Sequence, residues 1–570
     1  MSNEQGSEST LSRNQSIKEE QMAEEKEAPK KLSRRQFVKG AAAVAGAGAL
    51  AGCAPAASPA PECPPAVECA PCPGAGVPET WDEVADVVIV GYGDAGGSAA
   101  ITAHDAGADV LILEKMPKDK GAGGNSRVGG NMFLTFTDVD GALAYFMAME
   151  KDWGGSVEPE TVQAWAEQMI AYPAWLESMG AELAPAGYAE PEFPGLPGAE
   201  SVRTLRFQKS FDTPPDQNRY GPYDFLSALV EERSIKVMYE TPGKSLITNA
   251  QGEVIGVVAE SQGKLINVKA SKAVVLTCGG FDFNKEMKRN YLKGPCYGMG
   301  SPARTGDGII MALKVGADLW HMNNHAGPNP VGFMPPGLET TIRMNPPEFR
   351  FIWVDQDGKR FQDESRSALH GRGHEAIYYY DSVPQHIRFP RVPLWIVFDE
   401  TTRLAGSIAR PAYKGFSWNS YFDVYVWSDD NSKEVESGWI LQGDTLEELA
   451  ARIDTDPAML KETVTKYNEY CVVGKDDDFG RPENRLAPLD SAPYYAIEAW
   501  PVMVNTQGGP KRNSKAQIVD PFNEPIGRLY SAGDMGSIYG WTYNGGGNIG
   551  ECFAFGRIAG EHAAALEPWS

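Results

Sequence analysis

The sequence has few cysteine and histidine residues, and their spacing excludes several kinds of redox centre. Eight cysteines and seven histidines occur among 570 residues. No C-x-x-C-H motif occurs, which excludes a c-type haem attachment, and no closely spaced set of four cysteines suggests an iron–sulfur cluster. Cys278, Cys296, Cys471 and Cys552 are scattered without metal-ligand spacing, so we expect buried thiols and no metal site. Electrons used by this chain must therefore arrive from another molecule.

Long apolar runs and positive charge are also scarce. The run over 40–50 is rich in Ala and Gly, and it is too short and too poor in Leu and Ile to be a stable membrane span. The formal net charge of −24 at pH 7 argues against a nucleic-acid partner. The same charge favours solubility outside the cell, but it says little about a substrate.

The N-terminal region resembles an export signal. Residues 33–39 read Ser-Arg-Arg-Gln-Phe-Val-Lys and precede the weakly apolar run 40–50, as in a twin-arginine signal. That pathway carries folded proteins, which suits an enzyme that must acquire a bulky cofactor first. Residues 50–53 read Leu-Ala-Gly-Cys and resemble a lipobox, so we expect Cys53 to carry a lipid anchor. An unmodified cysteine in a cleaved leader is the alternative. The Pro- and Ala-rich stretch 54–80 predicts an extended tether.

A dinucleotide-binding βαβ pattern follows the tether. Its parts are an apolar strand at 87–90, a turn with Gly91, Gly93 and Gly96, an Ala-rich helix, a second strand at 109–113, and Glu114 at its end. In such a unit the first glycine permits a tight turn, and the second lets the backbone approach a pyrophosphate. The acid can bond the ribose hydroxyls. A Gly-rich turn in an ordinary α/β protein is the alternative, but the full context favours a redox cofactor.

The rest of the chain predicts a nucleotide domain interrupted by a second domain. Alternating strands from residue 245 lead to a buried strand that ends at Gly279 and Gly280. A region rich in aromatic residues follows, with helices expected at 445–453 and 457–470. We expect five segments: a signal with lipobox (1–53), a tether (54–80), a first part of the nucleotide domain (81–325), a capping domain (326–503) and a second part of the nucleotide domain (504–570).

Several motifs, in this order, resemble the FAD-dependent fumarate reductase and succinate dehydrogenase flavoprotein family. That family includes flavocytochrome-type fumarate reductases, urocanate reductases and 3-ketosteroid dehydrogenases. The resemblance implies an α/β fold, in which a Rossmann-type FAD-binding domain is interrupted by an α+β capping domain. It also implies hydride exchange between FAD and one carbon of a C=C bond. The motifs are the Gly91 turn, Gly124-Asn125-Ser126, Cys278-Gly279-Gly280-Phe281, Thr305-Gly306-Asp307-Gly308, Gly358-Lys359-Arg360-Phe361, Gly508-Gly509 and Ala532-Gly533-Asp534.

The same resemblance implies a set of FAD-binding residues. These are Gly91, Gly93, Asp94, Ala95, Gly96, Glu114, Lys115, Gly124, Asn125, Ser126, Gly129, Gly130, Gly280, Asp307, Gly533, Asp534, Gly547, Asn548 and Ile549.

The resemblance also implies catalytic residues in the capping domain. In fumarate reductases a strand ending Phe-Asp-x-x-x-Arg supplies an Arg that delivers a proton, and residues 398–403 match it with Arg403. Arginine is a poor acid in isolation, so a relay would have to reload it. Glu364 and Arg366 match the relay region, although their spacing is one residue shorter than in the family. An ion-paired or surface arginine at the start of a helix is the alternative for Arg403.

Two departures from fumarate reductases indicate the substrate class. Those enzymes hold a carboxylate with a His and an Arg, where this chain has Val504-Asn505 and Asn544. Tyr543 and Gly547 instead resemble the ketosteroid dehydrogenase pattern, in which a Tyr hydroxyl and a backbone amide bond a ketone oxygen. Such a pair would stabilise an enolate-like transition state. Packing beneath the flavin is the alternative for Tyr543.

We therefore expect an exported, lipid-anchored flavoenzyme that reduces an activated C=C bond in an enone- or enoate-type small molecule. Its electrons would come from a membrane respiratory chain, through a membrane-bound cytochrome or flavoprotein. The enzymatic alternatives are a 3-ketosteroid-type dehydrogenase and a fumarate reductase. The non-enzymatic alternative is a flavin lipoprotein that only relays electrons.

Overall fold

The computed structural model describes residues 77–151, 157–186, 191–209, 220–327, 331–338, 340–366, 377–383, 386–409 and 417–569. The expected export signal, Cys53 and most of the tether lie outside these residues. Within the described ranges, no helix combines the length and the apolar character that a membrane span requires. No cluster of three or more His, Cys, Asp or Glu side chains suited to a metal ion occurs there either.

The first sheet is mostly parallel and joins segments that are far apart in the sequence. Its strands are β1 (Glu83–Val90), β2 (Val110–Leu113), β6 (Lys236–Met238), β7 (Gly243–Thr248), β8 (Val254–Ser261), β9 (Lys264–Leu276), β23 (Gln517–Val519) and β24 (Pro525–Ser531). The strand order is β23-β24-β9-β1-β2-β6. The antiparallel hairpin of β7 and β8 is attached to this sheet by the pairing of β8 with β9. The central strand β1 pairs in parallel with β2 and β9. Its end, Val87–Val90, is almost fully buried, as its unbroken apolar run predicts.

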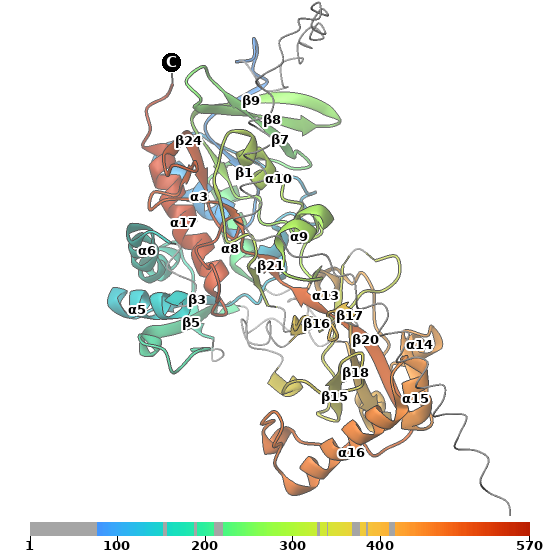
Figure 1. Ribbon diagram of the computed structural model, residues 1–570. Coiled ribbons are helices and arrows are strands. Elements are labelled where there is room, and N and C mark those ends of the chain that lie inside the picture. The colour runs from blue at the N-terminus through green and yellow to red at the C-terminus, as the bar shows by residue number, and fades with distance from the viewer. Residues whose placement is uncertain are drawn as a thin grey trace, which may run out of the picture. The chain divides into compact units, whose positions relative to one another are not determined.

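Two helices from opposite ends of the folded chain pack closely beside this sheet. They are α3 (Asp94–Asp105) and α17 (Gly547–Ala564), coloured blue and red in Figure 1. A Cβ on Gly556 would lie 2.8 Å from the Ala95 carbonyl oxygen, and one on Gly560 would lie 2.5 Å from the Ala99 carbonyl oxygen. Glycines one turn apart on α17 thus let the two backbones approach.

Other elements complete the first domain. Its helices are α4 (Gly124–Val128), α5 (Val139–Glu150), α6 (Pro159–Ser178), α8 (Pro222–Glu232), α9 (Lys285–Tyr291) and α10 (Asp307–Lys314). A small antiparallel sheet contains β3 (Phe133–Phe136), β4 (Leu183–Pro185) and β5 (Val202–Phe207). Its central strand is β5.

The second sheet forms the core of the inserted domain. Its strands are β10 (Tyr297–Gly298), β13 (Val331–Phe333), β14 (Ile342–Arg343), β15 (Phe351–Val354), β18 (Leu394–Asp399), β19 (Ile440–Gly443) and β20 (Tyr494–Met503). The long strand β20 pairs antiparallel with β13, β18 and β19. Because β10 also pairs with β20, this sheet begins before residue 326, and the expected domain boundaries stay predictions.

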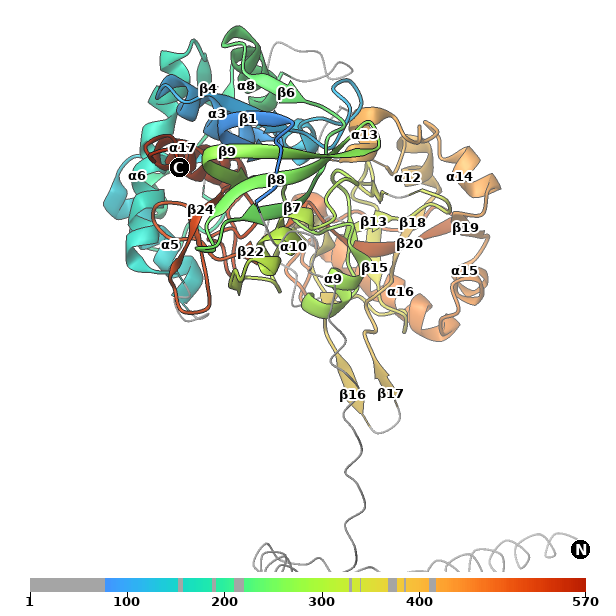
Figure 2. The same cartoon turned by 90° about the horizontal axis from the view of Figure 1, so that it is seen from above.

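Helices cover the inserted sheet, as Figure 2 shows for α15 and α16. The helices are α12 (Glu400–Ala405), α13 (Trp418–Phe422), α14 (Ser432–Glu436), α15 (Leu446–Arg452) and α16 (Pro457–Val473). The Asp456 side chain accepts hydrogen bonds from the amides of Ala458 and Met459, and Pro457 is the first residue of α16. The helix begins at residue 457, as expected from the sequence, and an Asp before a Pro is a favourable helix start.

Short paired strands join the two domains where the chain leaves the first and returns to it. The pairs are β11 (Leu319–Trp320) with β22 (Gly509–Pro510), and β12 (His325–Ala326) with β21 (Asn505–Thr506). A separate hairpin in the insertion contains β16 (Asp381–Val383) and β17 (His386–Arg388). This arrangement confirms the expected α/β class, with a parallel-sheet domain interrupted by an α+β insertion.

Candidate functional site

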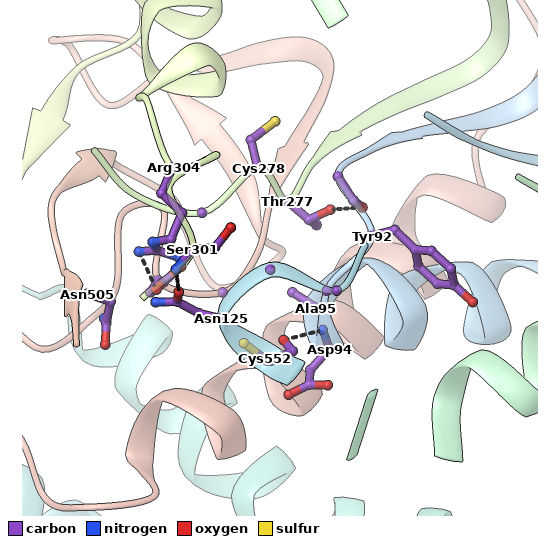
Figure 3. A pocket seen from close by; sticks show the side chains of 18 of the residues that line it. Tyr92, Asp94, Ala95, Asn125, Thr277, Cys278, Ser301, Arg304, Asn505 and Cys552 are labelled. Carbon is purple, nitrogen blue, oxygen red and sulfur yellow. Dashed lines mark hydrogen bonds and ion pairs between the residues drawn. The ribbon is translucent and has the colours of Figure 1, made fainter. Parts of the chain in front are cut away.

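A cavity lies where β1, β2 and β9 end at their carboxyl edge (Figure 3). Ligands of parallel α/β sheets bind at this edge. Val90, Leu113 and Thr277 bring the three strand ends to the cavity, and α4 and the start of α17 close other sides.

The glycine turn after β1 requires glycine at more than one position. Gly91 has a φ of +105°, and a Cβ there would lie 2.5 Å from the Thr277 carbonyl oxygen. A Cβ on Gly96 would clash with the Gly91 carbonyl oxygen. Gly93 lies against Ser126, where a Cβ would be 3.0 Å from Oγ. The backbone before α3 is therefore bare toward the cavity, as an approaching pyrophosphate requires.

Backbone amides hold Glu114 at the end of β2. The Tyr92 amide donates to Oε2 at 2.8 Å, and the Met116 amide donates to Oε1 at 2.7 Å. Burial raises the pKa of Glu114, and these two amides oppose that shift. The carboxylate stays oriented at the cavity, where it has further lone pairs for ribose hydroxyls.

The residues 301–307 form another wall, which carries three ion pairs. Lys115 Nζ donates to Asp307 Oδ2 and to Thr305 Oγ1, both at 2.8 Å. Arg304 donates to Asp282, and its Nη2 donates to Asp534 Oδ2 at 2.8 Å. These bonds fix segments that are remote in sequence around one cavity.

Asn125 also joins separate segments. Its Nδ2 donates to the Val504 carbonyl oxygen at 2.8 Å, and its Oδ1 accepts from the Ser301 amide at 2.7 Å. Figure 3 shows Asn125 between Ser301 and Asn505. The side chain thus ties α4 to the start of β21.

Most of the expected FAD-binding residues line this cavity. Those that line it are Gly91, Gly93, Asp94, Ala95, Glu114, Lys115, Gly124, Asn125, Ser126, Gly129, Gly130, Asp307, Gly533, Asp534, Asn548 and Ile549. The expected residues outside the lining are Gly96, Gly280 and Gly547. Gly96 packs on the Gly91 carbonyl, so its role is in the turn itself. A Cβ on Gly280 would meet Thr506 Oγ1.

Sequence reasoning missed other lining residues, among them Thr277, Ser301, Arg304 and Cys552. Arg304 directly precedes the Thr-Gly-Asp-Gly motif, and this position was the available signal. Its partners Asp282 and Asp534 lie 22 and 230 residues away in sequence, so no local pattern reveals the pairing.

Tyr543 lines the cavity with its side chain 8% exposed. Its hydroxyl oxygen accepts a hydrogen bond from the Gly546 amide at 3.1 Å. Burial raises its pKa well above the usual range, so the hydroxyl keeps its proton at neutral pH. The Gly547 amide donates to the Asn544 carbonyl oxygen at 2.9 Å, which uses it within the turn that starts α17.

The two positions that depart from fumarate reductases have different surroundings. Val504 and Asn505 line the cavity, and Asn505 Oδ1 accepts from Asn548 Nδ2 at 2.7 Å. Asn544 is fully buried behind the lining, where its Oδ1 accepts from the Tyr145 hydroxyl at 2.7 Å. Neither position offers a cation to the cavity.

Arg403 lies on α12 in the inserted domain and is not among the cavity residues. Its Nε and Nη2 donate to Glu400 at 2.6 and 2.7 Å, and its Nη1 donates to the Asp430 carbonyl oxygen at 3.0 Å. The hydrogen bond to Glu400 raises the pKa of Arg403 above its usual range. The ion pair with Glu400 matches one part of the alternative interpretation, but Arg403 lies in the last turn of α12 and not at its start.

Glu364 lies in a buried ion cluster of the inserted domain. Arg360 donates to its two carboxylate oxygens at 3.1 and 3.0 Å, and Arg481 Nη1 donates to Oε1 at 3.2 Å. No hydrogen bond recorded for the described residues joins Glu364 to Arg403. Arg366 ends the 3₁₀ turn η4 (Glu364–Arg366), and its side chain lies outside the described part of the chain.

The residues of the cavity fit a dinucleotide cofactor. Both carboxylate oxygens of Asp94 are buried without a hydrogen-bond partner in the described structure, although the residue is 1% exposed and lines the cavity. A hydrogen-bonding ligand in the cavity would satisfy these atoms. The bare glycine turn and the oriented Glu114 supply the backbone and ribose contacts that such a ligand needs.

Comparison with known sequences agrees with this geometry. The sequence model of a family described as an FAD binding domain matches residues 86–549. A second model, for the twin-arginine translocation pathway signal sequence, matches residues 31–51. The second match confirms the export signal expected at 33–39.

Relatives and a solved structure extend the comparison. A probable fumarate reductase of Shewanella frigidimarina is 29% identical over 498 residues, which cover 85% of this chain and 75% of the relative. A urocanate reductase of Eggerthella lenta is 29% identical over 507 residues, with 86% and 76% covered. The crystal structure of a 3-ketosteroid Δ1-dehydrogenase from Sterolibacterium denitrificans has a TM-score of 0.69 at 24% identity, with 85% of this chain and 100% of the other covered.

Proposed function

This chain belongs to the FAD-binding domain family, and from that membership we propose that it reduces a C=C bond conjugated to a single carbonyl group, as in an enone or an enoate. The expected cofactor, FAD, and the expected enzyme class, a flavin-dependent oxidoreductase acting on CH–CH bonds, are confirmed by the family match. Bound FAD supplies the hydride that one carbon of such a bond receives. The remaining steps fall to the chain's own residues.

The observation that supports this substrate class is the absence of an unengaged cation among the described lining residues. Lys115 and Arg304 are the lysine and arginine of the lining, and both are bonded to carboxylates. A bound dicarboxylate would need cationic partners, since buried charges without partners are strongly unfavourable. A ligand with one carbonyl group needs only a hydrogen-bond donor.

Tyr543 is the donor that the geometry favours. Its hydroxyl is protonated at neutral pH and the residue lines the cavity, so we propose that it bonds a carbonyl oxygen on which negative charge develops. The proposed second donor, the Gly547 amide, is engaged by Asn544. The Gly547 amide would have to release the Asn544 carbonyl oxygen before it could donate a hydrogen bond to a substrate.

Arg403 remains our proposed proton donor, with Glu364 and Arg366 as its proposed relay. Glu400 is a competing relay, because it contacts Arg403 directly and also accepts from the Tyr495 hydroxyl at 2.6 Å. Arg403→Ala should keep the flavin spectrum and reduction by dithionite, and lose at least about a hundredfold in turnover, the scale of a lost general acid. Arg452→Ala, an exposed arginine on α15, is the matched control. Unchanged turnover would assign the acid to another group.

Reoxidation of the reduced flavin tests the proposed reaction directly. Protein reduced under anaerobic conditions is mixed with fumarate, urocanate, cinnamates, stilbenes or enone steroids, and the return of flavin absorbance is followed. We expect a monocarbonyl compound to reoxidise the flavin and fumarate to do so poorly. Efficient turnover of fumarate would contradict the substrate class.

The same assay separates the alternatives. Faster flavin reduction by a saturated ketone than reoxidation by the enone would identify a ketosteroid-type dehydrogenase. Reoxidation by none of the compounds would favour the electron-relay lipoprotein.

We also propose a lipid anchor at Cys53 and a membrane-bound cytochrome or flavoprotein of an anaerobic respiratory chain as the electron donor. The export signal and the lipobox-like Leu-Ala-Gly-Cys support the anchor. The lack of a C-x-x-C-H motif supports an external donor. Cys53→Ala should move the protein from the membrane fraction to the soluble exported fraction. Quinol-treated membranes should reduce the flavin of this variant more slowly than that of the wild type.

A further inference from the structure

The FAD cavity is lined by more carboxyl groups than cations. Its acids are Asp94, Glu114, Asp307 and Asp534, and its cations are Lys115 and Arg304. The pyrophosphate of FAD adds negative charge near the amino end of α3. Like charges that are buried close together are unfavourable, and in such sites one of the acids usually keeps its proton.

Three of the four carboxyl groups accept hydrogen bonds that favour the charged form. Their donors are the backbone amides of Tyr92 and Met116 for Glu114, Lys115 Nζ for Asp307 and Arg304 Nη2 for Asp534. For Glu114 and Asp534 these donors oppose burial, which raises the pKa of both groups. The fourth acid, Asp94, accepts no hydrogen bond from a cation or a backbone amide in the described structure.

The neighbours of Asp94 do not supply a positive charge. The Asp224 carboxyl group on α8 repels a charge on Asp94, and the Cys552 thiol on α17 lies near it. The Ser126 Oγ on α4 accepts a hydrogen bond from the Asp94 amide at 2.8 Å. Burial, with a smaller contribution from Asp224, raises the pKa of Asp94 to about 7, and Ser126 opposes the shift. Figure 3 shows Asp94 at the start of α3, beside Cys552 of α17.

We propose that Asp94 binds FAD as a neutral carboxylic acid, which donates a hydrogen bond to an oxygen of the cofactor's pyrophosphate and makes FAD affinity depend on pH. The negative cofactor raises the pKa of Asp94 further, so binding takes up a proton. Affinity is then fully present below about pH 7, the pKa of the cofactor-free site. It falls as the pH rises toward the higher pKa of the bound state, by up to about tenfold per pH unit.

Serial dilution of the holoenzyme between pH 6 and 9 tests this proposal, with released FAD measured by its fluorescence. The wild-type dissociation constant should rise with pH by up to about tenfold per unit above pH 7. Asp94→Asn mimics the neutral acid and should bind FAD equally well across the range. Asp105→Asn, at the other end of α3, is the matched control and should keep the wild-type profile.

Two results would overturn the proposal: a wild-type constant that does not change with pH, or an Asp94→Asn profile as steep as the wild-type one. If Asp94→Asn does not load FAD, infrared spectra of wild-type holoenzyme with ¹³C-labelled aspartate decide. The carbonyl stretch of a protonated aspartic acid should be present at neutral pH, and its absence would refute the neutral form. Neither measurement involves a substrate, so the outcome is independent of the proposed reaction.

Discussion

At the scale of single residues, the Tyr543 hydroxyl has two roles that a substitution must separate. It accepts a hydrogen bond from the Gly546 amide at the start of α17, and we propose it as a donor to the substrate because Tyr543 lines the cavity. The first role is structural, since removal of the acceptor leaves a buried amide unsatisfied at a cost of about 1–3 kcal/mol. The second is chemical, because the donor would stabilise charge that develops on a substrate carbonyl.

Tyr543→Phe should slow reduction of a monocarbonyl substrate by roughly ten- to a thousandfold, as loss of one oxyanion donor does. Flavin content measured in the same samples shows whether the site is still assembled. Tyr539→Phe is the matched control, because this neighbouring buried tyrosine has no hydroxyl partner in the described structure. Equal rates for Tyr543→Phe and wild type would exclude the donor role.

At the scale of elements, the turn between β1 and α3 should admit no side chain at Gly93. The Cβ of a larger residue would meet Ser126, and the branches of valine would occupy the approach to the helix amides. Gly93→Val should therefore yield protein without yellow flavin. Gly195→Val is the control, since a Cβ at Gly195 meets no atom within 4 Å. Fully loaded Gly93→Val protein would refute this cofactor contact.

The buried cluster around Glu364 allows a prediction that separates stability from catalysis. Glu364→Gln leaves Arg360 and Arg481 without their shared carboxylate, which should destabilise the inserted domain by about 3–5 kcal/mol. Urea unfolding measures this loss. A structural role predicts lower stability and an unchanged pH profile of turnover at low temperature. A changed pH profile would instead support the relay.

At the scale of the whole molecule, the export signal should control where the loaded enzyme accumulates. Replacement of both Arg34 and Arg35 by Lys should retain the protein in the cytoplasm with its FAD bound, because the pathway reads the paired arginines. Arg13→Lys, in the same leader, should leave export unchanged. Cell fractionation with flavin fluorescence provides the measurement. Export of the double variant would contradict the signal.

Much of this protein was determined by local sequence. The apolar strand at 87–90, the glycine turn and Glu114 predicted the cofactor site, because each depends on backbone sterics or on short-range order. The Asp456-Pro457 start of α16 was readable for the same reason. The export signal could also be predicted from the sequence, because its motif is contiguous and does not depend on the fold.

Tertiary structure decided which charges meet. Arg304 joins Asp282 and Asp534, and Arg403 pairs with Glu400 while Glu364 joins Arg360 and Arg481. Two of these pairs, Arg304–Asp534 and Arg481–Glu364, join residues 230 and 117 positions apart, so no local periodicity brings them together. The same holds for Asp94, whose burial without a donor follows only from the packing of α4, α8 and α17 around α3. A carboxylate's neighbours set its charge, and those neighbours are fixed only by the folded chain.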